Sequence, residues 1–251
     1  MKTEIPVPLR IRRLPWSEQW QLHVPWFVAK VNGEYDFRIA EGDAWAKAIT
    51  QKRCWICGDK LGVYQAFIIG PMCCINRVSA DPPMHRDCAL YSVRVCPFLT
   101  QPKYVRRQKN RPPEELMKEI AGLYISRNPG VSLMWVARAD GYKLIDAHPG
   151  YLFRLFADPV EHLWFARGRL ATRAEVEESI ASGFPTLYDT AREEGDKAIK
   201  ALLQARMISE KFLPDASPDQ QVDRSAHGCP QGVHHDGHRE TVRDQSAPTV
   251  S

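Results

Sequence analysis

The feature that most constrains this chain is the clustering of its cysteines. Of seven cysteines, six lie between Cys54 and Cys96, and Cys229 stands alone near the C-terminus. The cluster opens with the sequence CWICG, in which Cys54 and Cys57 are two residues apart. Such a pair can be a redox couple, part of a disulfide framework or half of a metal site. Gly58 can supply the positive φ that lets both sulfurs face one point.

The cellular compartment narrows these alternatives. The N-terminal segment has no apolar run of signal-peptide length, and no apolar segment approaches the ~18 residues of a membrane helix. We therefore expect a cytoplasmic protein with no membrane contact. Thiols stay reduced there, so close cysteines favour metal binding or catalysis over disulfides. A thioredoxin-like redox pair would sit at a strand-to-helix junction. Here the pair follows a predicted helix, which favours a structural metal site.

Five other side chains compete to complete a tetrahedral site: Cys73, Cys74, His85, Cys88 and Cys96. His85 and Cys88 are three residues apart near a predicted helix start, so they share one face. Cys96 lies eight residues beyond Cys88, about 12 Å along a helix, which is too far for the same ion. Cys73 and Cys74 are adjacent and point to opposite faces if extended, so at most one of them could replace a ligand of the second pair.

The favoured ligand set for Zn²⁺ is Cys54, Cys57, His85 and Cys88. A CxxCG knuckle, a hairpin-like span and a helix opening with HxxC resemble a treble-clef zinc finger over residues 52–100. The wider run is also similar to uncharacterised zinc-finger-like proteins of bacteria and their phages, through residues 164–185. The resemblance implies a structural zinc site and a phage or mobile-element origin, and it brings no established activity.

The rest of the chain predicts an α+β fold: a treble-clef-like zinc module plus a mostly antiparallel β-meander, with C-terminal helices and a disordered tail. We expect four regions. They are an N-terminal hairpin and helix (1–53), the zinc module (54–100), a helix, meander and helices (101–213), and the tail (214–251). The tail has almost no apolar content, so it cannot offset the entropy of ordering.

Local signals place the elements. Asn32-Gly33 between two strand-like runs predicts a hairpin. Asp81 and Pro82 predict the start of a helix that Pro97 ends. A second helix is expected over 114–126, and strands over 131–138, 142–147, 151–157 and 161–168.

The C-terminal helices carry their own signals. Thr172 and Glu175 form a capping-box pattern, which opens a helix that Gly183 is expected to end. Pro185 is expected to open a longer helix over 186–212, with Gly195 inside it.

A basic stretch follows the predicted zinc helix and suggests contact with nucleic acid. The candidate residues are Arg86 and Arg94 inside the predicted zinc module, and Lys103, Arg106, Arg107 and Lys109 in the stretch after it. Phosphates would be attracted to them, and binding would weaken as salt rises. The net charge of +4 alone is too small to imply this function. The alternative is a solvated basic loop without a partner.

Two functions remain from the sequence. The first is a zinc-binding protein with a structural site, a binding or regulatory protein of phage or mobile-element type that acts on nucleic acid or on a host protein. A closed set of four ligands favours this structural role, and we assign no catalytic residue. The second is an enzyme with its site in a cleft between the zinc module and the β-meander. A cluster near His148, Glu161 and His162 would favour the enzyme, whereas a continuous basic surface would favour the binding protein.

Overall fold

The structure is a computed structural model that describes residues 5–101, 128–147 and 150–215. The chain divides into two compact units, Met1–Ala216 and Ser217–Ser251, of which the second lies outside the described residues. The helix predicted over 114–126 and nearly all of the predicted disordered tail also lie outside them.

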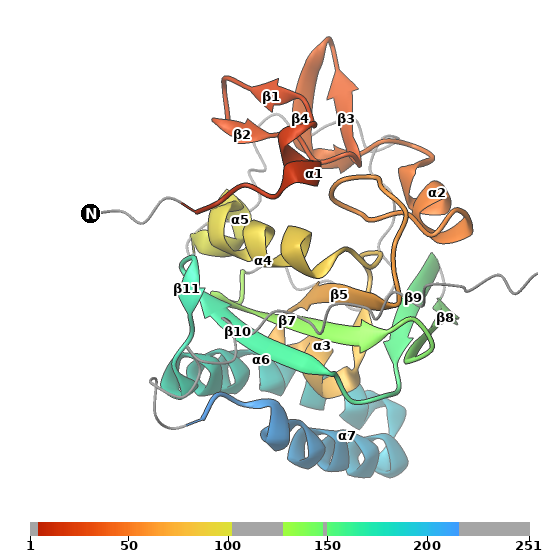
Figure 1. Ribbon diagram of the computed structural model, residues 1–251. Helices are drawn as coiled ribbons and strands as arrows, with labels where there is room; N and C mark the ends of the chain where they lie inside the picture. The colour runs from red at the N-terminus through yellow and green to blue at the C-terminus, as the bar shows by residue number, and fades with distance from the viewer. Residues whose placement is uncertain (1–4, 102–127, 148–149, 216–251) are drawn as a thin grey trace, which may run out of the picture. The chain divides into compact units, whose positions relative to one another are not determined.

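The described part of the chain mixes helices with antiparallel strands (Figure 1). The helices are α1 (Leu9–Arg12), α2 (Ala44–Thr50), α3 (Pro71–Asn76), α4 (Arg86–Val95), α5 (Pro97–Thr100), α6 (Arg173–Glu194) and α7 (Asp196–Ser209), followed by the 3-10 turn η2 (Glu210–Phe212). The strands are β1 (Trp16–Ser17), β2 (Leu22–His23), β3 (Val28–Val31), β4 (Glu34–Ala40), β5 (Tyr64–Ile69), β6 (Val78–Ser79), β7 (Val131–Arg138), β8 (Tyr142–Ala147), β9 (Gly150–Leu155), β10 (Glu161–Ala166) and β11 (Arg169–Leu170).

The central element is a four-stranded antiparallel sheet in the order β11-β10-β7-β5. Trp135 of β7 lies opposite His162 of β10 on one side and Phe67 of β5 on the other. Every residue of β7 except Arg138 is buried. Successive side chains of a strand point to opposite faces, so a strand that is buried throughout must be covered on both faces.

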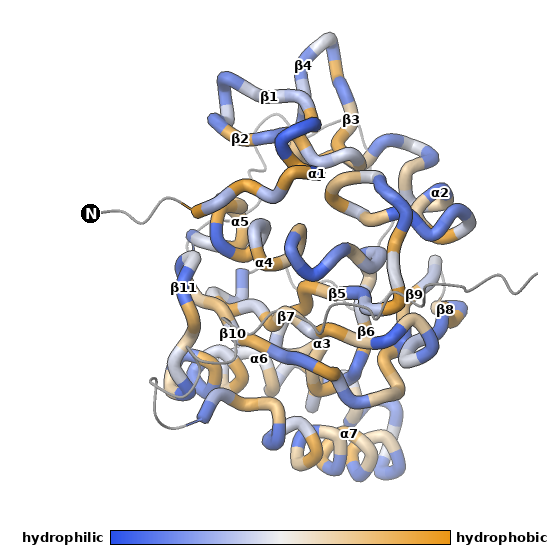
Figure 2. The backbone as a smooth tube through the Cα atoms, in the orientation of Figure 1, coloured by the Kyte–Doolittle hydropathy of each residue, from blue (hydrophilic) through white to orange (hydrophobic). Residues whose placement is uncertain are grey.

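Two hydrophobic cores lie on the two faces of this sheet. One core joins β7, β5 and β10 to α3, α6 and α7, and we call it the helical-face core. The other joins the same strands to α1, α2, α4 and residues 54–57, and we call it the metal-face core. Figure 1 shows α4 on one side of the sheet and α6 and α7 on the other. In Figure 2 hydrophobic and hydrophilic residues alternate along α6 and α7, as in helices buried on one side.

The predicted β-meander is wrong in its topology, although its four strands form where expected. Strands β8 and β9 leave the central sheet and pair in a separate sheet of order β6-β9-β8. Strand β10 then returns to pair with β7. The physical reason is burial: β7 is apolar on both faces and takes an interior position, whereas most residues of β8 are partly or fully exposed.

The predicted start of the helix at Asp81 is also wrong, because α4 begins at Arg86 with His85 as its N-cap. Met84 exchanges both backbone hydrogen bonds with Ala66 of β5, at 2.7 and 2.8 Å, and is therefore extended. Pro83 further disfavours helical geometry at the preceding residue. Helix α4 ends before Pro97, which opens the short helix α5.

The C-terminal helices are divided at a different glycine from the one predicted. The capping box at Thr172 is confirmed, but α6 continues through Gly183 and Pro185 and ends at Gly195. A Cβ at Gly183 would lie 3.2 Å from Met72 of α3, so this glycine allows two helices to approach. Gly195 has a φ of +100°, which favours glycine and separates α6 from α7.

The predicted N-terminal hairpin is confirmed. Strands β3 and β4 pair antiparallel, with Val31 opposite Glu34. The two turn residues, Asn32 and Gly33, have φ values of +51° and +87°. Two positive φ values in a two-residue turn are those of a type I′ hairpin, which matches the twist of the strands.

Candidate metal centre

A tight turn between α2 and β5, here called the knuckle (residues 53–60), presents the first two cysteines. Its ends form a bridge in which Arg53 and Lys60 are partners, and Cys54 donates its backbone N–H to Asp59 at 2.8 Å. Gly58 has a φ of +75°, and a Cβ there would lie 2.6 Å from the Trp26 ring. A glycine is therefore required at this position by both backbone conformation and space.

The second pair of candidate ligands is held by the edge of the central sheet. The Ala66–Met84 bridge fixes the chain just before His85, and α4 then places Cys88 in its first turn. The backbone N–H of Trp55 in the knuckle donates to the carbonyl of Pro83 at 3.1 Å, which joins the knuckle directly to the segment before His85. The knuckle and the start of α4 are thus positioned by backbone hydrogen bonds.

The structure brings Cys54, Cys57, His85 and Cys88 together, with their ligand atoms all within 4.8 Å of one another. The Nδ1 atom of His85 lies 3.4 Å from Sγ of Cys57 and 4.0 Å from Sγ of Cys88. A tetrahedral ion with metal–sulfur bonds of ~2.3 Å and a metal–nitrogen bond of ~2.0 Å has S···N edges of about 3.6 Å and S···S edges of about 3.8 Å. The cluster has the dimensions of a tetrahedral metal site.

A hydrogen bond outside the cluster orients the histidine. The Nε2 atom of His85 lies 3.1 Å from the carbonyl oxygen of Lys60. A carbonyl can only accept, so Nε2 carries a proton, and in the neutral ring the lone pair of Nδ1 is the one that faces the sulfurs. Metal-ligating histidines are commonly fixed in this way by a carbonyl or carboxylate. The carbonyl of Lys60 is a functional group that the sequence could not reveal, because every residue has one.

The electrostatics of the cluster favour a bound cation. Burial opposes the ionisation of Cys54, but hydrogen bonds from the thiols of Cys57 and Cys88 and from the backbone N–H groups of Cys57 and His85 lower its pKa to about 3. The pKa of the Cys88 thiol is raised, first by its hydrogen bond to Cys54 and then by Cys57 and burial. One thiolate in the cluster thus makes the next harder to form, and a divalent cation would relieve that repulsion.

The other described cysteines are separate from this cluster, which answers the question left open about the second pair. Cys73 and Cys74 lie on α3, and Cys96 follows α4. Burial raises the pKa of all three thiols, that of Cys74 to about 12. They are therefore neutral near pH 7 and poor metal ligands or nucleophiles. Cys229 lies outside the described residues.

The predicted nucleic-acid residues fall into two groups. Arg86 makes a two-pronged ion pair with Glu161 at 2.5 and 2.6 Å, and both side chains are largely covered. The guanidinium of Arg94 lies 6.0 Å from the ring centre of Phe165. Both arginines are thus engaged within the protein. The other four, Lys103, Arg106, Arg107 and Lys109, lie outside the described residues, and their role stays a prediction.

Within the described residues, Glu161 and His162 make separate contacts and do not form a catalytic cluster. Glu161 is held by Arg86, and His162 packs edge-on against Phe212 with ring centres 5.6 Å apart. His148 lies outside the described residues.

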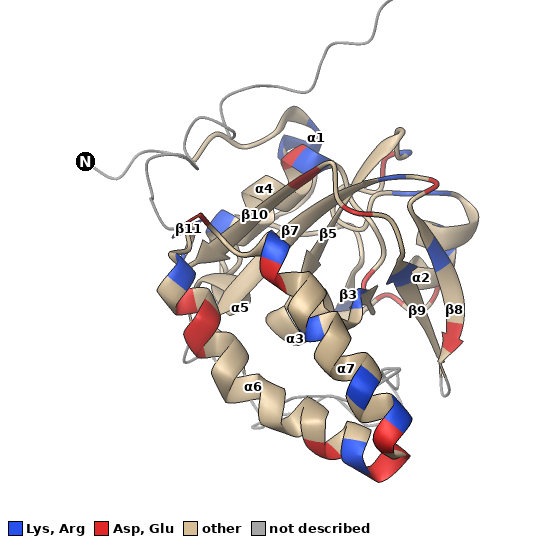
Figure 3. Cartoon of the chain, turned by 90° about the horizontal axis from the view of Figure 1, so that it is seen from below, with Lys and Arg blue, Asp and Glu red and all other residues tan. Residues whose placement is uncertain are grey.

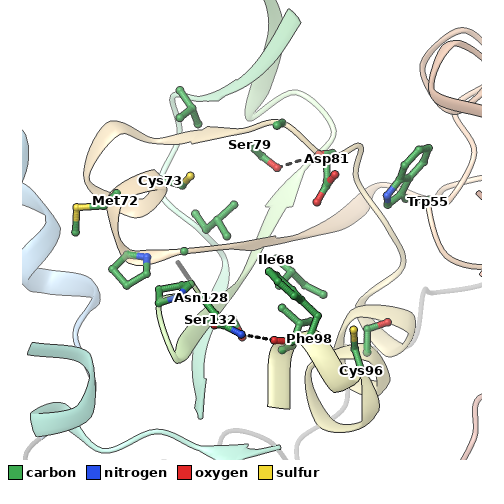
Figure 4. Close-up of a pocket in the computed structure, with 18 of the residues that line it drawn as sticks. Trp55, Ile68, Met72, Cys73, Ser79, Asp81, Cys96, Phe98, Asn128 and Ser132 are labelled. Carbon is green, nitrogen blue, oxygen red and sulfur yellow. Dashed lines mark hydrogen bonds between the residues drawn. The ribbon is translucent and has the colours of Figure 1, made fainter. Parts of the chain in front are cut away.

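A separate cavity of about 2250 Å³ lies beside β5 and the end of α4 (Figure 4). Its lining includes Ser79, Asp81 and the neutral thiols of Cys73 and Cys96. Figure 4 shows Asn128 donating to the carbonyl of Phe98 at its margin. Burial keeps the thiols of Cys73 and Cys96 protonated, so neither is an activated nucleophile.

Comparisons with protein-family models, curated proteins and solved structures found no match to this chain. Among the helices described here, none is long and apolar enough to cross a membrane.

Proposed function

We propose that this chain is a zinc-binding protein in which the ion acts as a structural clasp. The observation that carries the proposal is the set of four ligand atoms within 4.8 Å, supplied by three cysteines and one histidine. Sulfur and imidazole ligands in tetrahedral geometry favour Zn²⁺ over the harder cations Mg²⁺ and Ca²⁺. Four protein ligands would leave no open position for a substrate, so the ion would contribute folding energy rather than chemistry.

The clasp would join elements far apart in the sequence. Cys54 and Cys57 come from the knuckle, whereas His85 and Cys88 come from the start of α4. Three of the four ligands are themselves members of the metal-face core. A bound ion would therefore hold α4 and the knuckle on that face of the sheet and support the surface outside them. The geometry therefore favours a binding protein whose surface is held in place by the metal ion.

We also propose a relationship to treble-clef zinc fingers. It is supported by a knuckle that supplies two ligands and a helix start that supplies two. The segment between them departs from a simple hairpin: β5 pairs with β7, and α3 lies between β5 and β6. A phage or mobile-element origin stays a prediction of the sequence resemblance alone.

The proposal is tested by measuring the zinc content of the purified protein by mass spectrometry and by counting free thiols. We expect one zinc per chain, and loss of that zinc in Cys54→Ser. Cys96→Ser is the matched control, because this thiol lies outside the cluster and should leave the zinc content unchanged. Wild-type protein with reduced thiols, no zinc and an unchanged fold would refute the clasp.

A further inference from the structure

Three exposed cations lie at the two ends of the knuckle: Lys52, directly before it, and Arg53 and Lys60 within it. Arg53 and Lys60 are bridge partners, and Leu61 donates its N–H to Lys52 at 2.8 Å, so the three cations come from adjacent positions of one short ladder. Lys52, Arg53 and Lys60 are all exposed. Like charges directly opposite each other destabilise a pair of strands. A bound anion would remove this penalty.

The described residues do not neutralise these charges. Arg53 donates to the side chain of Gln51 and to the carbonyl of Gly58, at 2.7 and 2.9 Å, neither of which is charged. The neighbouring carboxylate, Asp59, is paired with Arg13 at 2.5 Å. Within the described part of the chain, Lys52, Arg53 and Lys60 form no ion pair.

Helix α1 extends this positive surface. The Arg13–Asp59 ion pair places the end of α1 against the knuckle, and Figure 1 shows α1 beside the loop between α2 and β5. Ile11 anchors the helix in the metal-face core and Arg12 is exposed, whereas the charge of Arg13 is balanced by Asp59. Both signs of charge occur along α6 and α7 (Figure 3).

Lys52 occupies a conformation that does not suit lysine. Its φ is +52°, directly after the C-terminal end of α2, where glycine is usually preferred. A lysine there costs backbone stability that a glycine would not. Lys52 therefore places an exposed positive charge at this position at a cost in backbone stability.

An exposed tryptophan, Trp16, follows α1 in the chain. Trp16 of β1 is 45% exposed and stands three residues after Arg13, within about 10 Å along the chain. Its ring meets His23 edge-on, with centres 5.1 Å apart, which leaves the tryptophan open to solvent. Single-stranded nucleic acids bind to cations through phosphates and to exposed aromatic rings through base stacking. An acidic protein would use the cations alone.

We propose that this surface binds single-stranded nucleic acid. Its members, which together we call the knuckle surface, are Arg12, Trp16, Lys52, Arg53 and Lys60. The inference rests on the proposed clasp, because the Lys60 carbonyl holds the His85 ring and the knuckle carries two of the ligands. Metal binding would therefore fix the spacing of the cations.

The binding test is fluorescence anisotropy with labelled oligo(dT) and oligo(U), titrated between about 50 and 200 mM salt. The variant Lys52→Gly/Lys60→Gln should weaken binding on the order of tenfold and reduce the salt slope by about 1.4, at ~0.7 for each lost phosphate contact. The control Lys197→Gln/Lys200→Gln removes the same charge from exposed positions of α7 and should change neither quantity. Equal binding by the two variants would overturn the proposal.

Two single variants separate charge from stacking and from structure. Lys52→Gly should weaken binding while the melting temperature stays constant or rises, because glycine suits the positive φ. If Lys52 had only a structural role, its replacement would not weaken binding while leaving the melting temperature constant or higher. Trp16→Ala should weaken binding about five- to hundredfold with an unchanged salt slope. Duplex DNA that binds as tightly as single strands, together with no effect of Trp16→Ala, would refute the stacking component. Preferential binding of polyglutamate would overturn the nucleic-acid assignment.

Zinc content measured in the same preparations separates this inference from the clasp. One zinc per chain without oligonucleotide binding would overturn the inference and leave the clasp standing. Binding to the knuckle surface by folded protein that contains no zinc would overturn the clasp instead.

Discussion

The two faces of the central sheet are stabilised by different means. Five of the buried members of the helical-face core are aromatic: Phe67, Trp135, Phe153, Trp164 and Phe212. The metal-face core has two, Trp55 and Phe165, and instead contains three cysteines of the metal cluster; each core has four buried alanines. Large side chains bury more apolar area, and each ~100 Å² of that area contributes about 2.5 kcal/mol. The metal face packs with smaller groups, and a bound ion would supply the stabilisation that its side chains do not.

The largest expected effect is the removal of the metal. Structural zinc sites contribute on the order of 10 kcal/mol to folding, which exceeds the net stability of many domains. We expect chelation, or Cys88→Ser, to remove hydrogen-exchange protection from α4 and the knuckle before it is lost from α6 and α7. Hydrogen exchange followed by mass spectrometry measures this order. Simultaneous loss on both faces would show that they do not differ in metal dependence.

The helical face should respond to a loss of volume instead. Phe67 is fully buried and contacts Tyr142 and Phe153, with ring centres 4.9 and 5.7 Å away. Phe67→Ala should lower the free energy of unfolding by about 3–5 kcal/mol. The zinc content of the protein that remains folded should be unchanged. Denaturant unfolding with parallel metal analysis checks both, and a loss of zinc would contradict the separation of the two cores.

Two glycines offer a matched comparison of the faces. Gly58→Ala places a Cβ 2.6 Å from Trp26 and forces a positive φ on alanine, so it should cost about 1–3 kcal/mol and weaken metal retention. Gly183→Ala meets the flexible side chain of Met72 at 3.2 Å, and alanine favours the helix by ~1 kcal/mol. The second variant should therefore stay within about 1 kcal/mol of wild type. Thermal unfolding of the pair tests this, and equal destabilisation would contradict it.

The smallest effect concerns acid stability at the start of α6. The ion pair with Arg169 is the main reason why the pKa of Glu175 is lowered from 4.5 to about 2, and the hydrogen bonds of the Thr172 cap add to it. A lowered folded-state pKa stabilises the fold above pH ~4.5, and this contribution is lost as the pH falls towards about 2. The pair is partly exposed, so its contribution is about 1 kcal/mol or less. Glu175→Gln should flatten the pH dependence of stability in this window. An unchanged slope would argue against the ion pair.

The amino-acid sequence by itself determined the local elements and the chemistry of the ligands. The Asn32-Gly33 turn, the capping box at Thr172 and the apolar strand β7 all follow from short-range rules of backbone conformation and hydrophobicity. The CxxC and HxxC spacings likewise selected the four candidate ligands, because residues three apart near a helix start share a face.

Only the tertiary structure decided how these elements combine. Met84 forms a strand bridge with Ala66, so α4 starts later than its local signals predict. Gly183 serves helix packing rather than helix termination, and β8 and β9 leave the central sheet. The Lys60 carbonyl that orients His85 carries no sequence signal at all. Each of these outcomes depends on residues distant in the chain, through backbone hydrogen bonds at Met84 and His85 and through packing at Gly183 and in the central sheet.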